Sequence, residues 1–277
     1  MLVPLQPPLI TVDDVLKLPN PAPDARIPYG SDPLQFGDLR LPKTQGPHPV
    51  IVIIHGGCWR SQYTIDHIGS FSDALTRDGL ATWTIEYRRV GDPGGGWPGT
   101  FLDVGAGIDH LRQLREEHPL DLGRVVVVGH SAGGHLALWA GARPKLADAT
   151  IRGSEPLAPK GIVSLAGVDD LRRAIDDGVC DNMAAELLGG TPAEVPERYA
   201  VASPIELLPL GVPQHLVSGA RDPVVPEDFG RAYSQAARDA GDEATLSVIP
   251  DAGHFELIAP STAAWQQVKK AIWELLE

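Results

Sequence analysis

A serine stands between two glycines at positions 129–133, Gly-His-Ser-Ala-Gly, which matches the pattern G-x-S-x-G. A buried strand is expected before it and a helix after it, and this strand–turn–helix context is the one that the pattern requires. The turn is so tight that side chains two residues from the serine would collide, which explains the glycines. We predict that Ser131 is a nucleophile at a helix N-terminus, where free N–H groups favour negative charge.

A nucleophilic serine needs a base to accept its proton and a carboxylate to orient that base. Of the nine histidines, His254 directly follows the last expected strand, where a loop opens at the edge of the sheet. Asp222 follows the preceding strand in a turn shaped by glycine and proline, and the order serine, aspartate, histidine suits this arrangement. Asp251 is a weaker alternative, because it lies only three residues before the base. His130 is expected to face away from Ser131.

A second glycine-containing loop, residues 55–59 with the sequence His-Gly-Gly-Cys-Trp, follows a run of β-branched residues. Small residues let the backbone approach a substrate carbonyl and present N–H donors to its oxygen. We assign this oxyanion hole to the N–H groups of Gly57 and Ala132, with Cys58 as a further candidate. His55 is interpreted as a structural histidine that braces the loop.

Three aromatic residues near these loops, Trp59, Tyr63 and Trp97, are candidates for walls of a substrate pocket. For two of them packing is an equally good interpretation. Trp59 could simply pack, and Trp97, in a loop rich in glycine and proline, could anchor that loop.

The elements that must position these residues alternate along the chain from residue 49 onward. The expected strands are 50–54, 81–87, 124–128, 161–165, 214–218 and 245–249. Helical patterns lie between them, which predicts an α/β fold with a mostly parallel sheet and helices on both faces. In such sheets the chemistry lies at the carboxyl ends of the strands.

Two stretches depart from this rhythm. Residues 1–48 hold a short helical pattern at 11–18 and two possible edge strands. Residues 169–210 are interpreted as a cap-like insertion of short helices within a single domain, 1–277. Its apolar residues are few and interleaved with acids, which predicts a pocket for short, uncharged acyl groups.

The bulk composition is that of a globular protein, with 43% hydrophobic and 21% charged residues. A formal net charge of −13 repels phosphate backbones, so no nucleic-acid partner is expected. The longest apolar run is too short to cross a membrane, and the first ten residues do not look like a signal peptide. No membrane partner, cofactor or metal is expected, and the sequence does not indicate an oligomeric state.

The chain has two cysteines, Cys58 and Cys180. Two cysteines are too few for a disulfide framework, and no CxxC spacing suggests zinc. They are interpreted as free thiols, which fits a reducing compartment and a cytoplasmic location.

These motifs resemble the α/β-hydrolase superfamily, and within it the group of esterases and kynurenine formamidases (arylformamidases) that carry HGGxW. The resemblance covers about residues 34–277 and rests on 55–59, 129–134, 221–225 and 252–254. It implies an α/β-hydrolase fold and the triad and oxyanion-hole residues named above. Cys58 replaces the third glycine of the HGGG pattern of hormone-sensitive lipases, which argues against that branch.

The function expected from this resemblance is that of a carboxylesterase acting on small soluble esters through an acyl-enzyme intermediate. The same site chemistry could cleave an aryl formamide such as N-formylkynurenine. A non-catalytic binding protein on a hydrolase scaffold is disfavoured, because all three triad candidates are present. A peptidase is disfavoured too, because no substrate-gating domain is visible.

Overall fold

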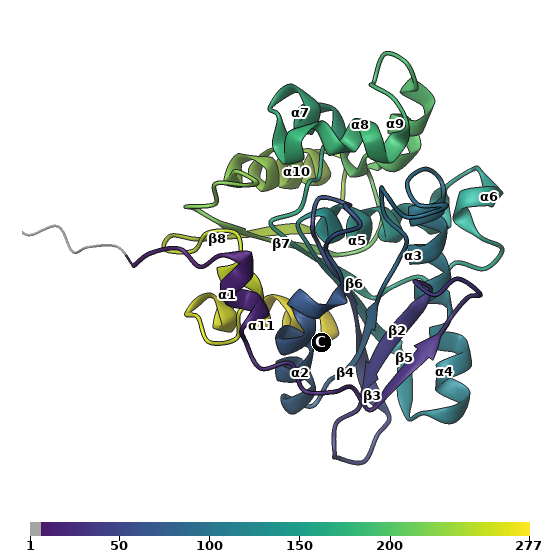
Figure 1. Ribbon diagram of the computed structural model, residues 1–277, viewed down its shortest axis with the longest axis vertical. Coiled ribbons are helices and arrows are strands. Elements are labelled where there is room, and N and C mark those ends of the chain that lie inside the picture. Colours follow the sequence, from purple (N-terminus) through teal and green to yellow (C-terminus); the bar gives the residue numbers. More distant parts are fainter. Residues whose placement is uncertain (1–6) are drawn as a thin grey trace, which may run out of the picture.

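The computed structural model describes residues 7–277, and its strands form one eight-stranded sheet (Figure 1). The strands run in the order β1-β2-β4-β3-β5-β6-β7-β8 across the sheet. The first two pairings are antiparallel and all pairings from β4 to β8 are parallel. The predicted α/β class with a mostly parallel sheet is confirmed. The strands are β1 (Ala25–Pro28), β2 (Phe36–Arg40), β3 (His48–Ile54), β4 (Ala81–Ile85), β5 (Leu120–His130), β6 (Gly161–Leu165), β7 (Gln214–Gly219) and β8 (Ala244–Ile249).

Helices connect the parallel strands, as the alternating pattern predicts. The α-helices are α1 (Val12–Leu16), α2 (Gly69–Arg77), α3 (Gly99–Asp109), α4 (Leu111–Glu117), α5 (Ala132–Ala142), α6 (Ala149–Arg152), α7 (Leu171–Asp176), α8 (Met183–Leu188), α9 (Pro196–Ala202), α10 (Glu227–Asp239) and α11 (Ala264–Leu276). The 3₁₀ helices are η1 (Ile65–Ile68), η2 (Arg143–Lys145), η3 (Val179–Asn182), η4 (Pro204–Leu207) and η5 (Glu256–Ile258).

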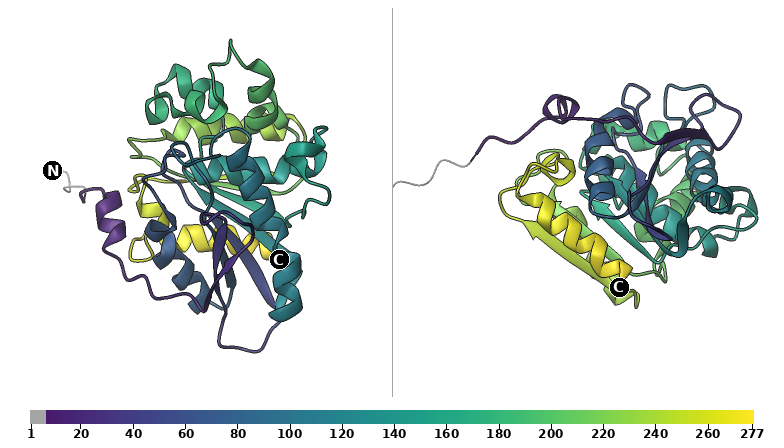
Figure 2. Two further views of the ribbon diagram at one scale, coloured as in Figure 1. Left: turned by 45° about the vertical axis from the view of Figure 1, so that its right-hand side comes forward. Right: turned by 90° about the horizontal axis from the view of Figure 1, so that it is seen from below.

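The central strands are buried on both faces, and alternate residues supply two separate cores. In β3, Val50, Val52 and Ile54 belong to one core, whereas Ile51 and Ile53 belong to the other. This alternation follows from the period of two in a strand. Helices α3, α4, α5 and α10 supply buried residues to the first core, and α2 and α11 to the second. The yellow helix α11 lies along the sheet when the molecule is seen from below (Figure 2).

The segment between β6 and β7 departs from this layered plan. Its helices α7, α8 and α9 lie together at one end of the molecule, near α10, in both side views (Figures 1 and 2). The small helix α1 lies at the periphery, outside the layers of sheet and helices. Within residues 7–277, no helix combines the length and the apolar character needed to span a lipid bilayer.

Candidate active site

The connection from β5 to α5 holds Ser131 in a strained conformation. Its φ of 57° and ψ of −121° lie where residues with a side chain are rarely found. A Cβ on Gly129 would lie 1.9 Å from the carbonyl oxygen of Gly133, and a Cβ on Gly133 would lie 2.1 Å from that of Ile54. The two glycines therefore let this tight turn form directly against the end of β3.

The loops after β7 and β8 bring a carboxylate and an imidazole together. Oδ2 of Asp222 lies 2.6 Å from Nδ1 of His254, and both side chains are buried. The other oxygen of Asp222 accepts hydrogen bonds from the backbone N–H groups of Val224 and Val225, at 2.7 and 2.9 Å. The aspartate is thus held by its own turn and presents one oxygen to the histidine. The alternative carboxylate, Asp251, is exposed.

Ser131 and His254 border the same cavity, which has a volume of about 170 Å³. It is lined by Val12, Gly57, Cys58, Tyr63, His67, His130, Ser131, Val224, His254 and Phe255. Within residues 7–277 the Ser131 hydroxyl makes no hydrogen bond to His254. Catalytic hydrogen bonds are often long in ligand-free hydrolases and tighten when substrate binds.

The loop after β3 borders Ser131 closely. A Cβ on Gly56 would lie 2.7 Å from the carbonyl oxygen of His130 and 2.9 Å from Cβ of Ser131. Gly57 and Cys58 follow with positive φ values of 106° and 50°, and both line the cavity. In the part of the chain that the structure describes, their N–H groups donate to no acceptor. Ala132 begins α5, where a backbone N–H has no partner within the helix.

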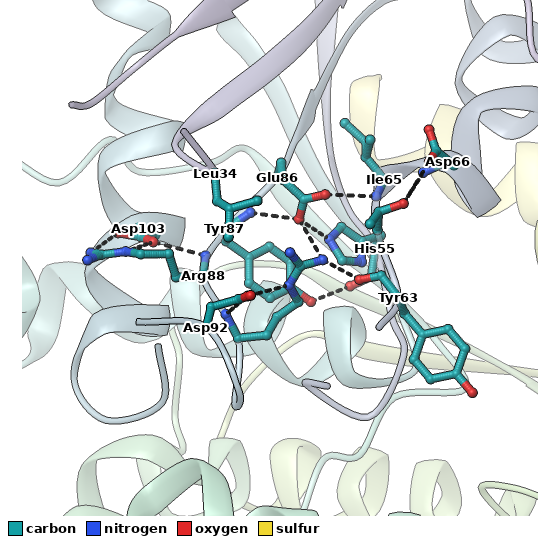
Figure 3. Close-up of polar contacts among 12 residues, drawn as sticks. Leu34, His55, Tyr63, Ile65, Asp66, Glu86, Tyr87, Arg88, Asp92 and Asp103 are labelled. Atoms are coloured by element: carbon teal, nitrogen blue, oxygen red, sulfur yellow. Dashed lines mark hydrogen bonds and ion pairs between the residues drawn. The ribbon is translucent and has the colours of Figure 1, made fainter. Parts of the chain in front are cut away.

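A buried polar network packs against this loop. Of its residues, the sequence analysis singled out only His55. Nε2 of His55 lies 2.8 Å from Oε1 of Glu86, and Oε2 of Glu86 accepts the N–H of Ile65 at 3.0 Å (Figure 3). Arg89 lies 3.1 Å from the same carboxylate, and the Tyr87 hydroxyl donates to the His55 carbonyl oxygen at 2.7 Å. The interpretation of His55 as a brace agrees with these contacts.

Electrostatics explain how this network tolerates burial. Burial opposes ionisation of Glu86, but the attraction and hydrogen bond of His55, together with Arg89, hold its pKa below the ordinary value. The signal that could have revealed it is the presence of three charged residues in the stretch Glu-Tyr-Arg-Arg at 86–89, directly after a run expected to form a buried strand.

Two further histidines line the cavity. His130 was expected to face away from Ser131. Its ring lies 4.5 Å from that of His254, its Nε2 lies 3.0 Å from the His254 carbonyl oxygen, and it lines the cavity that Ser131 also borders. Burial, together with the neighbouring His254, lowers the pKa of His130 well below its usual value. Burial and the nearby His55 lower the pKa of His67 to about 3. Both imidazoles are therefore neutral near pH 7 and add no charge to the cavity.

The three aromatic candidates for the pocket have different outcomes. Tyr63 lines the cavity, and Figure 3 shows its ring directed away from the Glu86 network. Trp59 does not line it, because its side chain is fully buried and its indole N–H donates to Nδ1 of His135 at 3.2 Å. Trp97 does not line it either. Its ring packs on Phe101, and its backbone N–H donates to the Leu187 carbonyl oxygen at 2.7 Å, so Trp97 anchors its loop to α8.

The prediction of two free thiols is wrong. Cys58 and Cys180 form a disulfide that joins the loop after β3 to η3, across 122 residues of sequence. Arg60 reinforces this junction with an ion pair of 2.9 Å to Asp181. A count of cysteines could not reveal the pair, because the two residues meet only when the segment between β6 and β7 folds back toward β3.

The segment 169–210 was interpreted as a cap-like insertion, which would place it over the candidate nucleophile Ser131. None of its residues is among the described residues that line the cavity. The N-terminal helix α1 instead supplies Val12 to the lining. The segment contacts the site indirectly, through Cys180.

Comparison with known proteins shows the family of this chain. The model of the BD-FAE family matches residues 38–236, which is more than half of the chain. The chain belongs to the BD-FAE family. This member is 28% identical to the esterase LipC of Mycobacterium tuberculosis (strain ATCC 25618 / H37Rv) over 84% of its own length, and 27% identical to LipQ of the same organism over 82%. It spans only 60% of LipC and 55% of LipQ.

Solved structures confirm the fold of this family member. A truncated carbohydrate esterase from gut microbiota superposes with a TM-score of 0.79 at 24% identity, covering 90% of this chain and 94% of that one. The predicted α/β-hydrolase fold is thereby confirmed.

Proposed function

We propose that this protein is a serine hydrolase, a carboxylesterase that cleaves small soluble esters through an acyl-enzyme intermediate. The observation that carries the proposal is the pairing of Asp222 with His254 at 2.6 Å beside a cavity that Ser131 also borders. The free N–H groups of Gly57 and Cys58 at that cavity support the assignment of an oxyanion hole. The names of LipC and LipQ as esterases are consistent with it.

In the first half of the proposed reaction, the Ser131 oxygen attacks the ester carbonyl carbon and His254 accepts the hydroxyl proton. Asp222 stabilises the resulting imidazolium and keeps its orientation. The carbonyl oxygen becomes an oxyanion, which accepts hydrogen bonds from the N–H groups of Gly57, Cys58 and Ala132. The intermediate collapses, the alcohol leaves with the proton from His254, and the acyl group stays on Ser131.

In the second half, water attacks the acyl carbon while His254 accepts a proton from it. The Ser131 oxygen then leaves, takes that proton back from His254, and the carboxylic acid is released. Each step uses groups of the chain and water, so the proposal needs no cofactor.

Small, uncharged substrates are favoured by the cavity. Its volume of about 170 Å³ is below the roughly 300–1,000 Å³ of pockets that bury drug-sized ligands. Its walls include the apolar side chains of Val12, Val224 and Phe255, and its additional histidines are neutral. An extra methylene gains roughly 0.8 kcal/mol only while apolar surface is available to bury it. We therefore expect kcat/KM to be highest for acetyl to butyryl esters.

The test combines covalent labelling with a substrate panel. Wild type should react with a fluorophosphonate at Ser131 and hydrolyse p-nitrophenyl acetate and butyrate faster than the octanoate. Ser131→Ala should fold, escape labelling and lose about 10³-fold or more of the activity. Ser154→Ala, at an exposed serine, is the matched control and should behave as wild type.

Each alternative predicts a different result in the same panel. Unlabelled wild type without activity would indicate a binding protein on a hydrolase scaffold and overturn the proposal. A far higher kcat/KM for N-formylkynurenine than for any ester would make the protein an arylformamidase with the same triad.

The cytoplasmic location expected from the sequence rested on two free thiols and on first residues that do not look like a signal peptide, and the disulfide removes the first of these grounds. Disulfides persist in oxidising compartments and are rare in the cytosol. The state of Cys58 and Cys180 in intact cells therefore tests the location. Rapid maleimide labelling of both thiols on lysis would support a cytoplasmic protein, and labelling only after reduction would contradict it.

A further inference from the structure

The N-terminal strap, residues 7–18, contributes Val12 to the cavity beside Ser131, although it lies outside the family match. Building on the proposed hydrolase function, we propose that the strap is a wall of the substrate pocket, with Val12 as a specificity-determining residue. Glu256 is the positioning residue that holds the strap against the loop of the catalytic histidine. The ligand of this wall is the apolar, uncharged group of an ester.

Val12 is placed at the pocket by a helix with a defined start. Thr11 and Asp14 form a reciprocal capping box, in which each side chain binds the backbone N–H of the other residue. Val12 then begins α1 and lines the cavity that Ser131 and His254 also border. One turn later Val15 is 3% exposed and packs in the core with Ile65 and Ile68 of η1. Since Val15 is buried in the core, Val12 occupies a fixed place at the cavity.

Glu256 joins the strap to the histidine loop with both of its oxygens. Oε1 accepts the backbone N–H of Ile10 at 2.8 Å, across 246 residues of sequence. Oε2 accepts the backbone N–H of Gly253 at 2.9 Å, directly before His254. The Glu256 side chain is mostly buried, so these bonds are shielded from water.

A second contact lies beside the catalytic carboxylate. Arg221, which precedes Asp222, donates to the backbone oxygen of Pro7 at 3.0 Å. Leu9 packs closely on the histidine loop, because a Cβ on Gly253 would lie 3.0 Å from its methyl groups. The strap is thus attached next to both members of the Asp222–His254 pair, so its position and theirs depend on one another.

The chemistry of the strap indicates which substrate group it contacts. Val12 has an apolar side chain, and Val224 and Phe255 are further apolar residues of the cavity lining. Asp13 and Asp14 are exposed on the same helix turn and would repel an anionic substrate. A neutral alkyl or aryl group is therefore the expected occupant.

The test changes the size of residue 12 in the full chain. Val12→Phe should lower the ratio of kcat/KM for p-nitrophenyl hexanoate over acetate by about tenfold or more, and Val12→Ala should raise it a few-fold. Leu16→Phe makes a similar enlargement at a residue of α1 that is 53% exposed, and should leave the ratio unchanged. A parallel series of acetates of longer alcohols shows whether the acyl or the alcohol group meets the wall. Ratios that stay at the wild-type value in both series would overturn the role of Val12.

Glu256 is tested by its coupling to Val12. Glu256→Gln turns one of the two accepting oxygens into an amide NH₂, which cannot accept the N–H of Ile10 or Gly253. Loss of one such bond should raise KM for apolar esters by roughly 3- to 10-fold. Glu256→Asp, which keeps both carboxylate oxygens, should show a smaller increase in KM. In the double variant Val12→Phe/Glu256→Gln, the change in the hexanoate-to-acetate ratio of kcat/KM should be smaller than in Val12→Phe alone. A strap that is held less firmly can move away and make room for the larger side chain. A lower Tm with unchanged KM and no coupling would show that Glu256 is only structural.

Labelling by the fluorophosphonate separates this proposal from the proposed function. If Ser131 is labelled in every variant while the ratios do not move, only the role of the strap is overturned. If wild type itself is not labelled, the hydrolase proposal fails first.

Discussion

Oδ2 of Asp222 lies 2.6 Å from Nδ1 of His254, although 32 residues separate the two in sequence. Each residue stands in a loop directly after a parallel strand, β7 or β8, and neighbouring parallel strands deliver such loops to the same edge of the sheet. The pair therefore depends on the register of two adjacent strands.

Asp222→Asn should lower kcat by about 10⁴-fold with little change in KM, because the amide favours the wrong tautomer of His254. Steady-state kinetics on p-nitrophenyl acetate measure the effect. Asp251→Asn makes the same substitution at the exposed aspartate three residues before His254, and should keep wild-type activity. If Asp251→Asn lost activity and Asp222→Asn did not, the carboxylate would be misassigned.

Cys180→Ser should lower the free energy of unfolding by about 2–5 kcal/mol, because the disulfide closes a long loop in the unfolded chain. Urea denaturation with and without dithiothreitol measures the loss. Reductant should bring wild type to the level of Cys180→Ser and leave the variant unchanged. Two titratable thiols in the oxidised, folded wild type would contradict the disulfide.

Glu86→Gln should destabilise the fold by about 3–5 kcal/mol at pH 7, because it leaves Arg89 buried without its full counter-charge. The pKa of Glu86 is below its ordinary value in the folded state, so its contribution is complete above the unfolded pKa. It is lost as pH falls through the folded pKa. The difference between wild type and variant should therefore shrink in urea titrations near pH 4 and below.

The matched control for this prediction is Glu117→Gln, which removes the same charge from an exposed position at the end of α4. Its stability should differ little from wild type at pH 7. A difference between Glu86→Gln and wild type that stays constant down to the acid transition would contradict the depressed pKa.

Asp169→Asn should make the stability of the protein less dependent on pH. Burial raises the pKa of Asp169 from 3.8 to about 8, so the folded carboxyl keeps its proton while the unfolded one has lost it. Between about pH 4 and pH 8 the unfolded state thus binds fewer protons, and wild-type stability falls as pH rises. Above pH 8 this contribution levels off. Tm values of both proteins from pH 5 to 9 check the effect, and parallel curves would contradict it.

The sequence by itself determined the buried strands, the helices between them and the residues that directly follow the strands. Runs such as 50–54 and 125–128 are too uniformly β-branched for anything but buried strands, and the helices between them require parallel pairing. Ser131, Asp222 and His254 could be proposed as a triad because each follows such a strand, and the carboxyl ends of parallel strands share one edge. The glycines at 129 and 133 could be interpreted too, since steric exclusion in a tight turn is local.

Only the tertiary structure decided which distant segments meet. Cys58 and Cys180 pair across 122 residues, and Glu256 binds Ile10 across 246, and no local pattern encodes either contact. For the same reason, the aromatic type of Trp59 could not reveal that its ring turns into the core toward His135. Periodicity reports which face of an element is buried. The partner that buries this face depends on how loops and peripheral helices pack. Here this packing brings Val12 of α1, and no described residue of the segment 169–210, to the cavity lining.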